Sequence, residues 1–165
     1  MKEVTLEFLI SKPVKNVYDV VSDFANYQAY AKAVNSVVVT EVCSESCQSA
    51  WEVKFRDGIL KWIEKDYFFP ETNRIEFHQV KGDLEVFSGY WEAVKVYDEA
   101  THLTFNAHFD LGLPQLEKLL DPIAQQALEE NITSIVQGLF GELVTIKKQE
   151  STESDAETKP ILSMK

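Results

Sequence analysis

The chain has 165 residues, 45% hydrophobic and 26% charged, which is the length and composition of one globular domain. Its net charge of −11 argues against nucleic acid and anionic membrane surfaces as partners, because both are bound through clustered Lys and Arg. No apolar run approaches the ~20 residues of a membrane-spanning helix, and the N-terminus does not resemble a signal peptide, so we expect a cytoplasmic protein.

The N-terminal part predicts a strand, two short helices and a second strand. Residues 3–10 alternate apolar and polar side chains, as a half-buried strand does. Ser11 is placed to cap a first helix, and Asp23 is placed to cap a second short helix over residues 24–33. The β-branched run 36–42 predicts the second strand.

Residues 51–91 predict four consecutive strands. The breaks at 56–58, 70–73 and 81–83 each contain Gly, Pro, Asn or Asp, the residues that tight turns require. This stretch holds more aromatic side chains than one flat core face needs. We interpret them as the wall of a cavity for a flat or lipophilic molecule, although they could instead fill a core. The set comprises Trp51, Trp62, Phe87, Trp91 and, from the following strand, Phe105.

The C-terminal part predicts a last strand over 102–111 and one long helix. Asp121 is placed as the cap of this helix, and an apolar stripe from Ile123 to Leu143 extends it to about Lys148. A helix of that length can cross the concave face of a seven-stranded sheet.

These elements predict an α+β fold over residues 1–148, in which a bent, seven-stranded antiparallel sheet surrounds a long C-terminal helix and two short helices follow the first strand. The acidic segment 149–165 lacks periodicity, so we expect it to be disordered. Either a monomer or a homodimer is compatible with the sequence, because an exposed edge strand could pair two copies.

Two carboxyl groups are the first candidates for chemistry. Trp62, Glu64 and Asp66 alternate along one predicted strand and so point to one side of the sheet. If that side is the cavity, burial raises the pKa of both carboxyl groups and suits them to proton transfer next to a carbonyl. If the strand has the opposite orientation, both carboxylates lie in water.

Four further side chains have alternative interpretations. His78 could move a proton or hydrogen-bond an enolate inside the cavity, or it could face solvent opposite Phe77. Arg56, in a predicted hairpin turn, could meet a ligand at the cavity mouth or be simply solvated. Tyr27 and Tyr30 could gate the cavity with an inward hydroxyl, or pack in the core.

No motif predicts a metal or a cofactor. Cys43 and Cys47 lack a nearby His or a second cysteine pair, and a reducing compartment favours free thiols. The chain contains no glycine-rich phosphate loop, no G-x-S-x-G and no H-E-x-x-H. We therefore expect neither a metal nor a nucleotide.

The segments 17–27, 55–66, 74–77 and 82–91 resemble the polyketide cyclase/dehydrase branch of the START-like (SRPBCC) superfamily, and the resemblance extends from Glu3 to about Lys148. It implies the helix-grip (START/Bet v 1-like) fold with a hydrophobic cavity. It also implies cavity-lining roles for Trp62, Trp91 and Phe105. The cavity arginines of bacterial aromatase/cyclases fall near Asp66 and His78, and a helix-borne tyrosine falls near Val34.

Two functions follow from this resemblance. The first is a cyclase/aromatase that binds a poly-β-ketone tethered to an acyl carrier protein and directs aldol cyclisation and dehydration, with Glu64, Asp66 or His78 moving protons. In this function Arg56 could meet the phosphopantetheine arm of the carrier protein. The second is a carrier of a lipid or quinone without turnover. Convergent polar groups deep in the cavity would favour the enzyme, whereas an apolar wall would favour the carrier.

Overall fold

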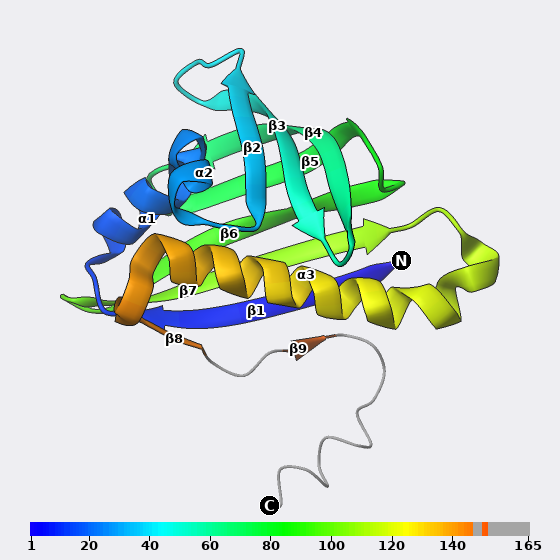
Figure 1. The fold of residues 1–165 in the computed structure, drawn as a ribbon. Helices are drawn as coiled ribbons and strands as arrows, with labels where there is room; N and C mark the ends of the chain where they lie inside the picture. Colours follow the sequence, from blue (N-terminus) through cyan, green and yellow to red (C-terminus); the bar gives the residue numbers. More distant parts are fainter. Residues whose placement is uncertain (147–149, 152–165) are drawn as a thin grey trace, which may run out of the picture.

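The computed structural model describes residues 1–146 and 150–151, and its strands form one antiparallel sheet (Figure 1). The strand order is β2-β3-β4-β5-β6-β7-β1-β8, with β9 also paired to β1. The seven long strands are those predicted, and β8 and β9 are additional. The bounds are β1 (Lys2–Ile10), β2 (Val34–Thr40), β3 (Ser46–Phe55), β4 (Gly58–Phe69), β5 (Arg74–Gly82), β6 (Val86–Tyr97), β7 (Ala100–Asp110), β8 (Val144–Ile146) and β9 (Glu150–Ser151).

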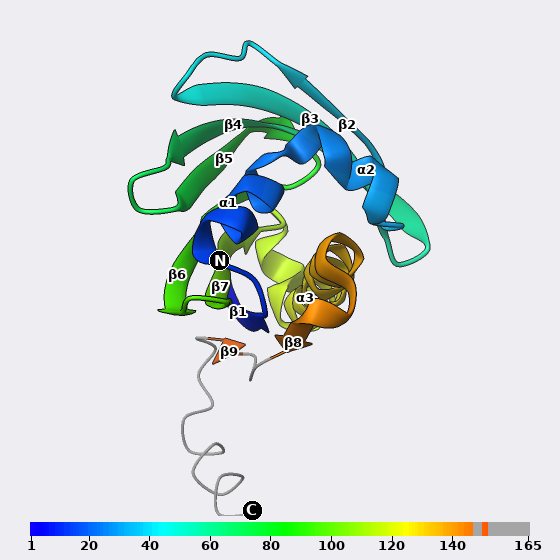
Figure 2. The same cartoon turned by 90° about the vertical axis from the view of Figure 1, so that its left-hand side faces the viewer.

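The sheet curves around one long helix, as the helix-grip prediction requires. Figure 2 shows the strands arranged as an arc around α3, with α1 and α2 also on the concave side. Short 3₁₀ turns adjoin the α-helices. The helical elements are α1 (Val14–Ser22), η1 (Phe24–Asn26), α2 (Tyr27–Tyr30), η2 (Pro114–Leu116), α3 (Glu117–Phe140) and η3 (Gly141–Leu143).

α3 differs from its prediction at both ends. It begins at Glu117, so Asp121 is buried inside the helix and does not cap it. It ends at Phe140, well before Lys148, because Gly141 adopts a positive φ of 61° that a helix cannot continue. The chain then pairs with β1 as β8.

The predicted caps of the two short helices are also wrong. α1 begins directly after Pro13, and no side chain caps it, so Ser11 has no capping role. Asp23 makes no capping hydrogen bond to the backbone either; its carboxylate accepts a hydrogen bond of 2.6 Å from the Asn26 side chain.

The core lies between the concave face of the sheet and α3. In β1, the alternating residues Val4, Leu6, Phe8 and Ile10 are fully buried, as their period of two requires. Gly138 lets α3 approach α2 closely, because a Cβ at this position would lie 2.2 Å from the carbonyl oxygen of Tyr30.

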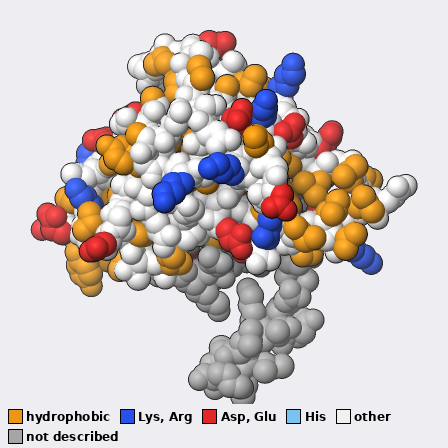
Figure 3. Space-filling view, viewed as in Figure 1, with side chains coloured by type: hydrophobic (Ala, Val, Ile, Leu, Met, Phe, Trp, Pro, Cys, Tyr) orange, Lys and Arg blue, Asp and Glu red, His pale blue; other side chains and the backbone are white. Residues whose placement is uncertain are grey.

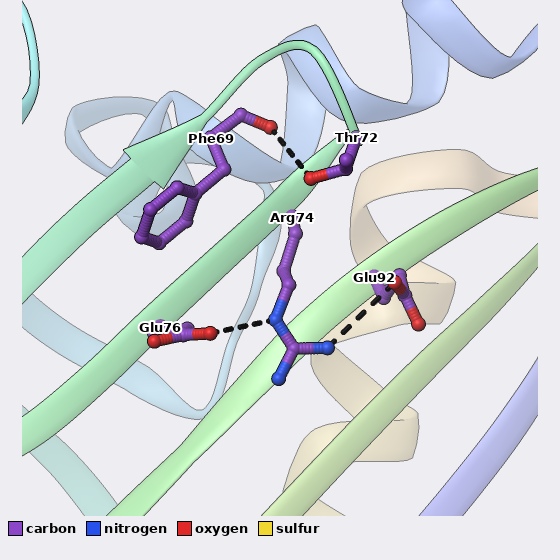
Figure 4. A network of polar contacts seen from close by, with 5 residues as sticks. All are labelled: Phe69, Thr72, Arg74, Glu76 and Glu92. Carbon is purple, nitrogen blue, oxygen red and sulfur yellow. Dashed lines mark hydrogen bonds and ion pairs between the residues drawn. The ribbon is translucent and has the colours of Figure 1, made fainter.

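The convex face of the sheet carries solvated charges. Arg74 lies between two carboxylates (Figure 4), with its Nε 2.8 Å from Glu76 and its Nη1 3.6 Å from Glu92. Its guanidinium also lies over the ring of Tyr90, 3.9 Å from the centroid. Arg74 is thus fully engaged on the face opposite the core.

Hydrophobic side chains gather over the beginning of α3 (Figure 3). The exposed residues there include Leu113, Leu116, Leu119 and Ile123. Ile123 was expected to face the sheet, but it is 48% exposed. Burial of the predicted apolar stripe therefore begins only at Ala127, and its last residue, Leu143, is again exposed.

The predicted disordered segment 149–165 lies outside the described residues, apart from the two residues of β9. β9 pairs with β1 in the register Val4↔Ser151. Within the described ranges, no helix combines the length and apolarity needed to cross a membrane. Cys43 is exposed and Cys47 is buried, and both are free thiols.

Candidate active site

A cavity of about 80 Å³ lies between the concave face of the sheet and α3. Strands β3 to β7 supply one wall, α3 supplies the opposite wall, and Phe24 and Tyr27 from the short helices close one side. The α3 side chains that line it are Ala124, Leu128, Asn131, Ile132 and Ile135.

Aromatic rings make up most of the sheet wall. Trp51 and Trp62 are directly opposite each other on β3 and β4, and their rings stack with centroids 5.9 Å apart. Trp62 meets Phe87 edge to face at 5.4 Å, and Trp91 meets Phe105 at 4.7 Å. All five aromatic residues that we selected from the sequence therefore line the cavity, and their role in ligand binding stays a prediction.

The same rings leave little open space. An apolar cavity of about 150 Å³ is known to hold benzene, and pockets for larger ligands usually measure about 300–1,000 Å³. The aromatic set thus both fills the core and lines a small cavity. A polyketide-sized ligand requires these rings or α3 to move.

Glu64 and Asp66 both point to the concave side of β4. Glu64 is 5% exposed and lines the cavity, whereas Asp66 is fully buried behind the aromatic wall. The indole N–H of Trp62 donates a hydrogen bond of 2.7 Å to Glu64 Oε1. The alternation of Trp62, Glu64 and Asp66 did not decide whether these side chains face the cavity or solvent. In the structure they face inward.

A polar group on β3 supports Asp66 from behind. The hydroxyl of Ser49 donates to Asp66 Oδ2 at 2.5 Å, and the indole N–H of Trp51 donates to Ser49 Oγ at 2.8 Å. The thiol of Cys47 lies 3.6 Å from the same carboxylate oxygen. Our sequence reasoning missed Ser49; its signal was the alternation Cys47, Ser49, Trp51 on the strand adjacent to β4.

The surroundings of the two carboxyl groups shift their pKa values. Burial raises the pKa of Glu64 well above its ordinary value, and the hydrogen bond and negative charge of Asp66 raise it further; the hydrogen bonds of Trp62 and Ser49 oppose this. Burial also raises the pKa of Asp66, while hydrogen bonds from Glu64, Ser49 and Cys47 lower it. Both carboxyl groups therefore bind a proton more tightly than they would in water.

The cavity position considered for His78 is wrong. His78 is exposed on the convex face, where its ring stacks on Tyr67 with centroids 6.0 Å apart. The reason is the register of β4 and β5, which places Phe77 opposite Asp66 and so turns Phe77 inward and His78 outward.

Arg56, Tyr27 and Tyr30 do not present polar groups to the cavity. Arg56 occupies the β3–β4 turn, with its Nη1 3.6 Å from Glu130 on α3. Tyr30 is 61% exposed, so its expected gating role has no structural support. Tyr27 lines the cavity with its ring, but its hydroxyl donates to the carbonyl oxygen of Val21 at 2.5 Å.

In the described part of the chain, no group of three or more His, Cys, Asp or Glu side chains is placed to hold a metal ion. The polar chemistry of the cavity therefore centres on Glu64, with Asp66 and Ser49 behind it. Asn131 also lines the cavity, but its amide donates to the Lys54 carbonyl oxygen at 2.6 Å.

Comparison with known proteins identifies the same architecture. A family model described as "Polyketide cyclase / dehydrase and lipid transport" matches residues 10–136. Among solved structures, a protein from Thermus thermophilus is 26% identical with a TM-score of 0.77, and the alignment covers 83% of this chain and 93% of that one.

Two other similar structures share the fold at lower identity. The Zhui aromatase/cyclase from Streptomyces sp. R1128 is 16% identical with a TM-score of 0.76, over 86% of this chain and 92% of that one. A START superfamily protein from Mycobacterium smegmatis is 16% identical with a TM-score of 0.73, over 87% and 97%. No curated protein matches the chain significantly.

Proposed function

We propose that this chain, which belongs to the family of polyketide cyclases, dehydrases and lipid transport proteins, binds a poly-β-ketone in its cavity and directs aldol cyclisation and dehydration to an aromatic ring. The observation that carries the proposal is the position of Glu64. Among the described residues it is the one carboxyl group that lines this aromatic cavity. An acyl carrier protein is the proposed source of the substrate chain.

The aromatic wall would hold the flexible chain in a folded conformation. Trp51, Trp62, Phe87, Trp91 and Phe105 present flat faces and edges on one side of the cavity. Holding reacting carbons close together can replace a large part of the entropic barrier to ring closure. Because the unoccupied cavity is only about 80 Å³, we expect the rings or α3 to move when the substrate enters.

Glu64 would carry protons in both steps. In ring closure, its carboxylic acid protonates the carbonyl oxygen that becomes a hydroxyl as the new carbon–carbon bond forms. The resulting carboxylate takes the proton that the attacking α-carbon loses, so Glu64 is protonated again. In dehydration, its carboxylic acid protonates the hydroxyl as the carbon–oxygen bond breaks and water leaves. The resulting carboxylate then removes the α-proton, and the electrons of the carbon–hydrogen bond form the double bond. Glu64 ends protonated, so the sequence consumes no other reactant.

The second candidate is a carrier of a lipid or a quinone. It is favoured by the apolar character of the wall, in which Glu64 and Asn131 are the polar exceptions among the described residues. A carrier requires tight binding and no chemical change, so it assigns no catalytic role to Glu64.

A reconstituted assay separates the two candidates. A poly-β-ketone on an acyl carrier protein would be incubated with the wild-type protein, with Glu64→Gln, or with Glu76→Gln as a control on the convex face. We expect an aromatised product from the wild type and the control, formed about 10²- to 10⁴-fold more slowly by Glu64→Gln. Quenching of tryptophan fluorescence should show that Glu64→Gln still binds the ligand.

Product formation by Glu64→Gln at the wild-type rate would refute the role of Glu64. Equal product with and without the wild-type protein, combined with tight binding of a quinone or lipid, would establish the carrier instead.

A further inference from the structure

Glu64 and Asp66 are two buried carboxyl groups that have no partner in an ion pair among the described residues. Asp66 is 0% exposed and Glu64 is 5% exposed. In residues 1–146 and 150–151, no Lys, Arg or His forms an ion pair with either group. Two adjacent negative charges in an apolar interior are strongly unfavourable, which favours a state in which the pair holds one proton.

The hydrogen-bond donors around the pair are divided unequally. Asp66 Oδ2 lies within reach of both Ser49 Oγ, at 2.5 Å, and Cys47 Sγ, at 3.6 Å, whereas Glu64 Oε1 accepts from Trp62. Asp66 Oδ1 is buried and has no donor when both carboxyl groups are ionised. A proton on Glu64 supplies the missing donor, and the donors on Asp66 favour its ionised form.

We propose that the pair holds a single proton that resides on Glu64, that Asp66 and Ser49 are positioning residues for this proton, and that the cavity therefore selects neutral ligands with a carbonyl oxygen. The selectivity rests on the proposed function, because it takes the cavity as the ligand site. In the ligand-free protein the O–H of Glu64 donates to Asp66. When a ligand binds, this O–H donates instead to the ligand's carbonyl oxygen, while the charge of Asp66 repels a carboxylate ligand.

The other groups facing the pair preserve this arrangement. On β3, burial raises the pKa of Cys47 to about 12, and on α2, burial raises the pKa of Tyr27, so both are neutral. On β5, uncharged Gln79 and Phe77 lie opposite Glu64 and Asp66. His78, on the outer face of β5, lowers the pKa of Asp66 and so favours its ionised form. The α3 side chains that line the cavity are uncharged.

Infrared spectroscopy of the ligand-free protein tests the proton directly. The wild type should show the carbonyl band of a buried carboxylic acid at neutral pH, and Glu64→Gln should lack it. Because Asp66→Asn removes the neighbouring charge, it should lower the pH at which the band disappears by about one unit or more. The pair loses its protons in two steps, and Ser49→Ala should raise the apparent pKa of the lower step.

The spectra can also overturn the proposal. Absence of the acid band in the wild type, or a band that survives Glu64→Gln, contradicts a proton on Glu64. An identical titration in wild type, Asp66→Asn and Ser49→Ala contradicts the positioning roles. Ser49→Ala serves as the second variant where Asp66→Asn does not fold.

Ligand selectivity is tested with three small probes that share a phenyl ring and differ in charge: acetophenone, benzoate and 1-phenylethylammonium. Titration calorimetry should show that acetophenone binds at least about 10-fold more tightly than benzoate, and that Asp66→Asn reduces this preference. Tighter binding of the ammonium probe or of benzoate would refute the selectivity. Because these measurements do not involve turnover, their failure is distinct from failure to form an aromatised product.

Discussion

Replacing Glu64 with Gln should change how the stability of the protein depends on pH. Burial and the proximity of Asp66 raise the pKa of Glu64 well above its ordinary value of 4.5. The folded protein therefore binds this proton more tightly than the unfolded chain does. The stabilisation is fully present below the unfolded pKa and is lost as the pH rises through the folded pKa.

The expected magnitude follows from proton linkage. Each pH unit between the unfolded and folded pKa lowers the free energy of unfolding by about 1.4 kcal/mol. Gln is neutral at every pH, and its carbonyl oxygen can still accept the 2.7 Å hydrogen bond from Trp62. We therefore expect Glu64→Gln to equal the wild type near pH 5 and to exceed it by about 1–3 kcal/mol near pH 8.

This difference is measured by urea unfolding at several pH values between about 5 and 9, with circular dichroism as the signal. Glu76→Gln is the matched control, because the Glu76 side chain is 47% exposed on the convex face and should leave the pH profile unchanged. Parallel profiles for the wild type and Glu64→Gln would refute the raised pKa of Glu64.

Two further variants test the packing and the thiols. Gly138→Ala should lower the free energy of unfolding by about 1–3 kcal/mol, because its Cβ would meet the Tyr30 carbonyl oxygen at 2.2 Å. Thermal unfolding measures this change, with Gln137→Ala at an exposed neighbouring position as the control. Equal stability of the two variants would contradict the close approach of α3 to α2. In the native protein a thiol reagent should modify exposed Cys43 quickly and buried Cys47 slowly, because burial raises the pKa of Cys47 to about 12. Rapid labelling of Cys43→Ser without denaturant would show that Cys47 is accessible.

Local patterns in the sequence were sufficient to predict the seven long strands. Alternation in β1 and turn residues between β3, β4, β5 and β6 act over a few residues, so they can be read without knowing which strands become neighbours. The same alternation placed Trp62, Glu64 and Asp66 on one side of β4. The excess of aromatic side chains in residues 51–91 supplied the expectation of a cavity, and the family resemblance implied the same cavity.

Only the tertiary structure decided which side of each strand faces inward and what the inward groups contact. A period of two cannot tell the cavity from solvent, so Glu64 and His78 each had a cavity-facing and a solvent-facing interpretation. The register of β4 and β5 turned Glu64 inward and His78 outward. Ser49 reaches Asp66 across two paired strands, a contact that depends on register alone. The free volume of the cavity depends on how the aromatic rings interlock, and the pKa values depend on burial and neighbours, neither of which is a local property of the chain.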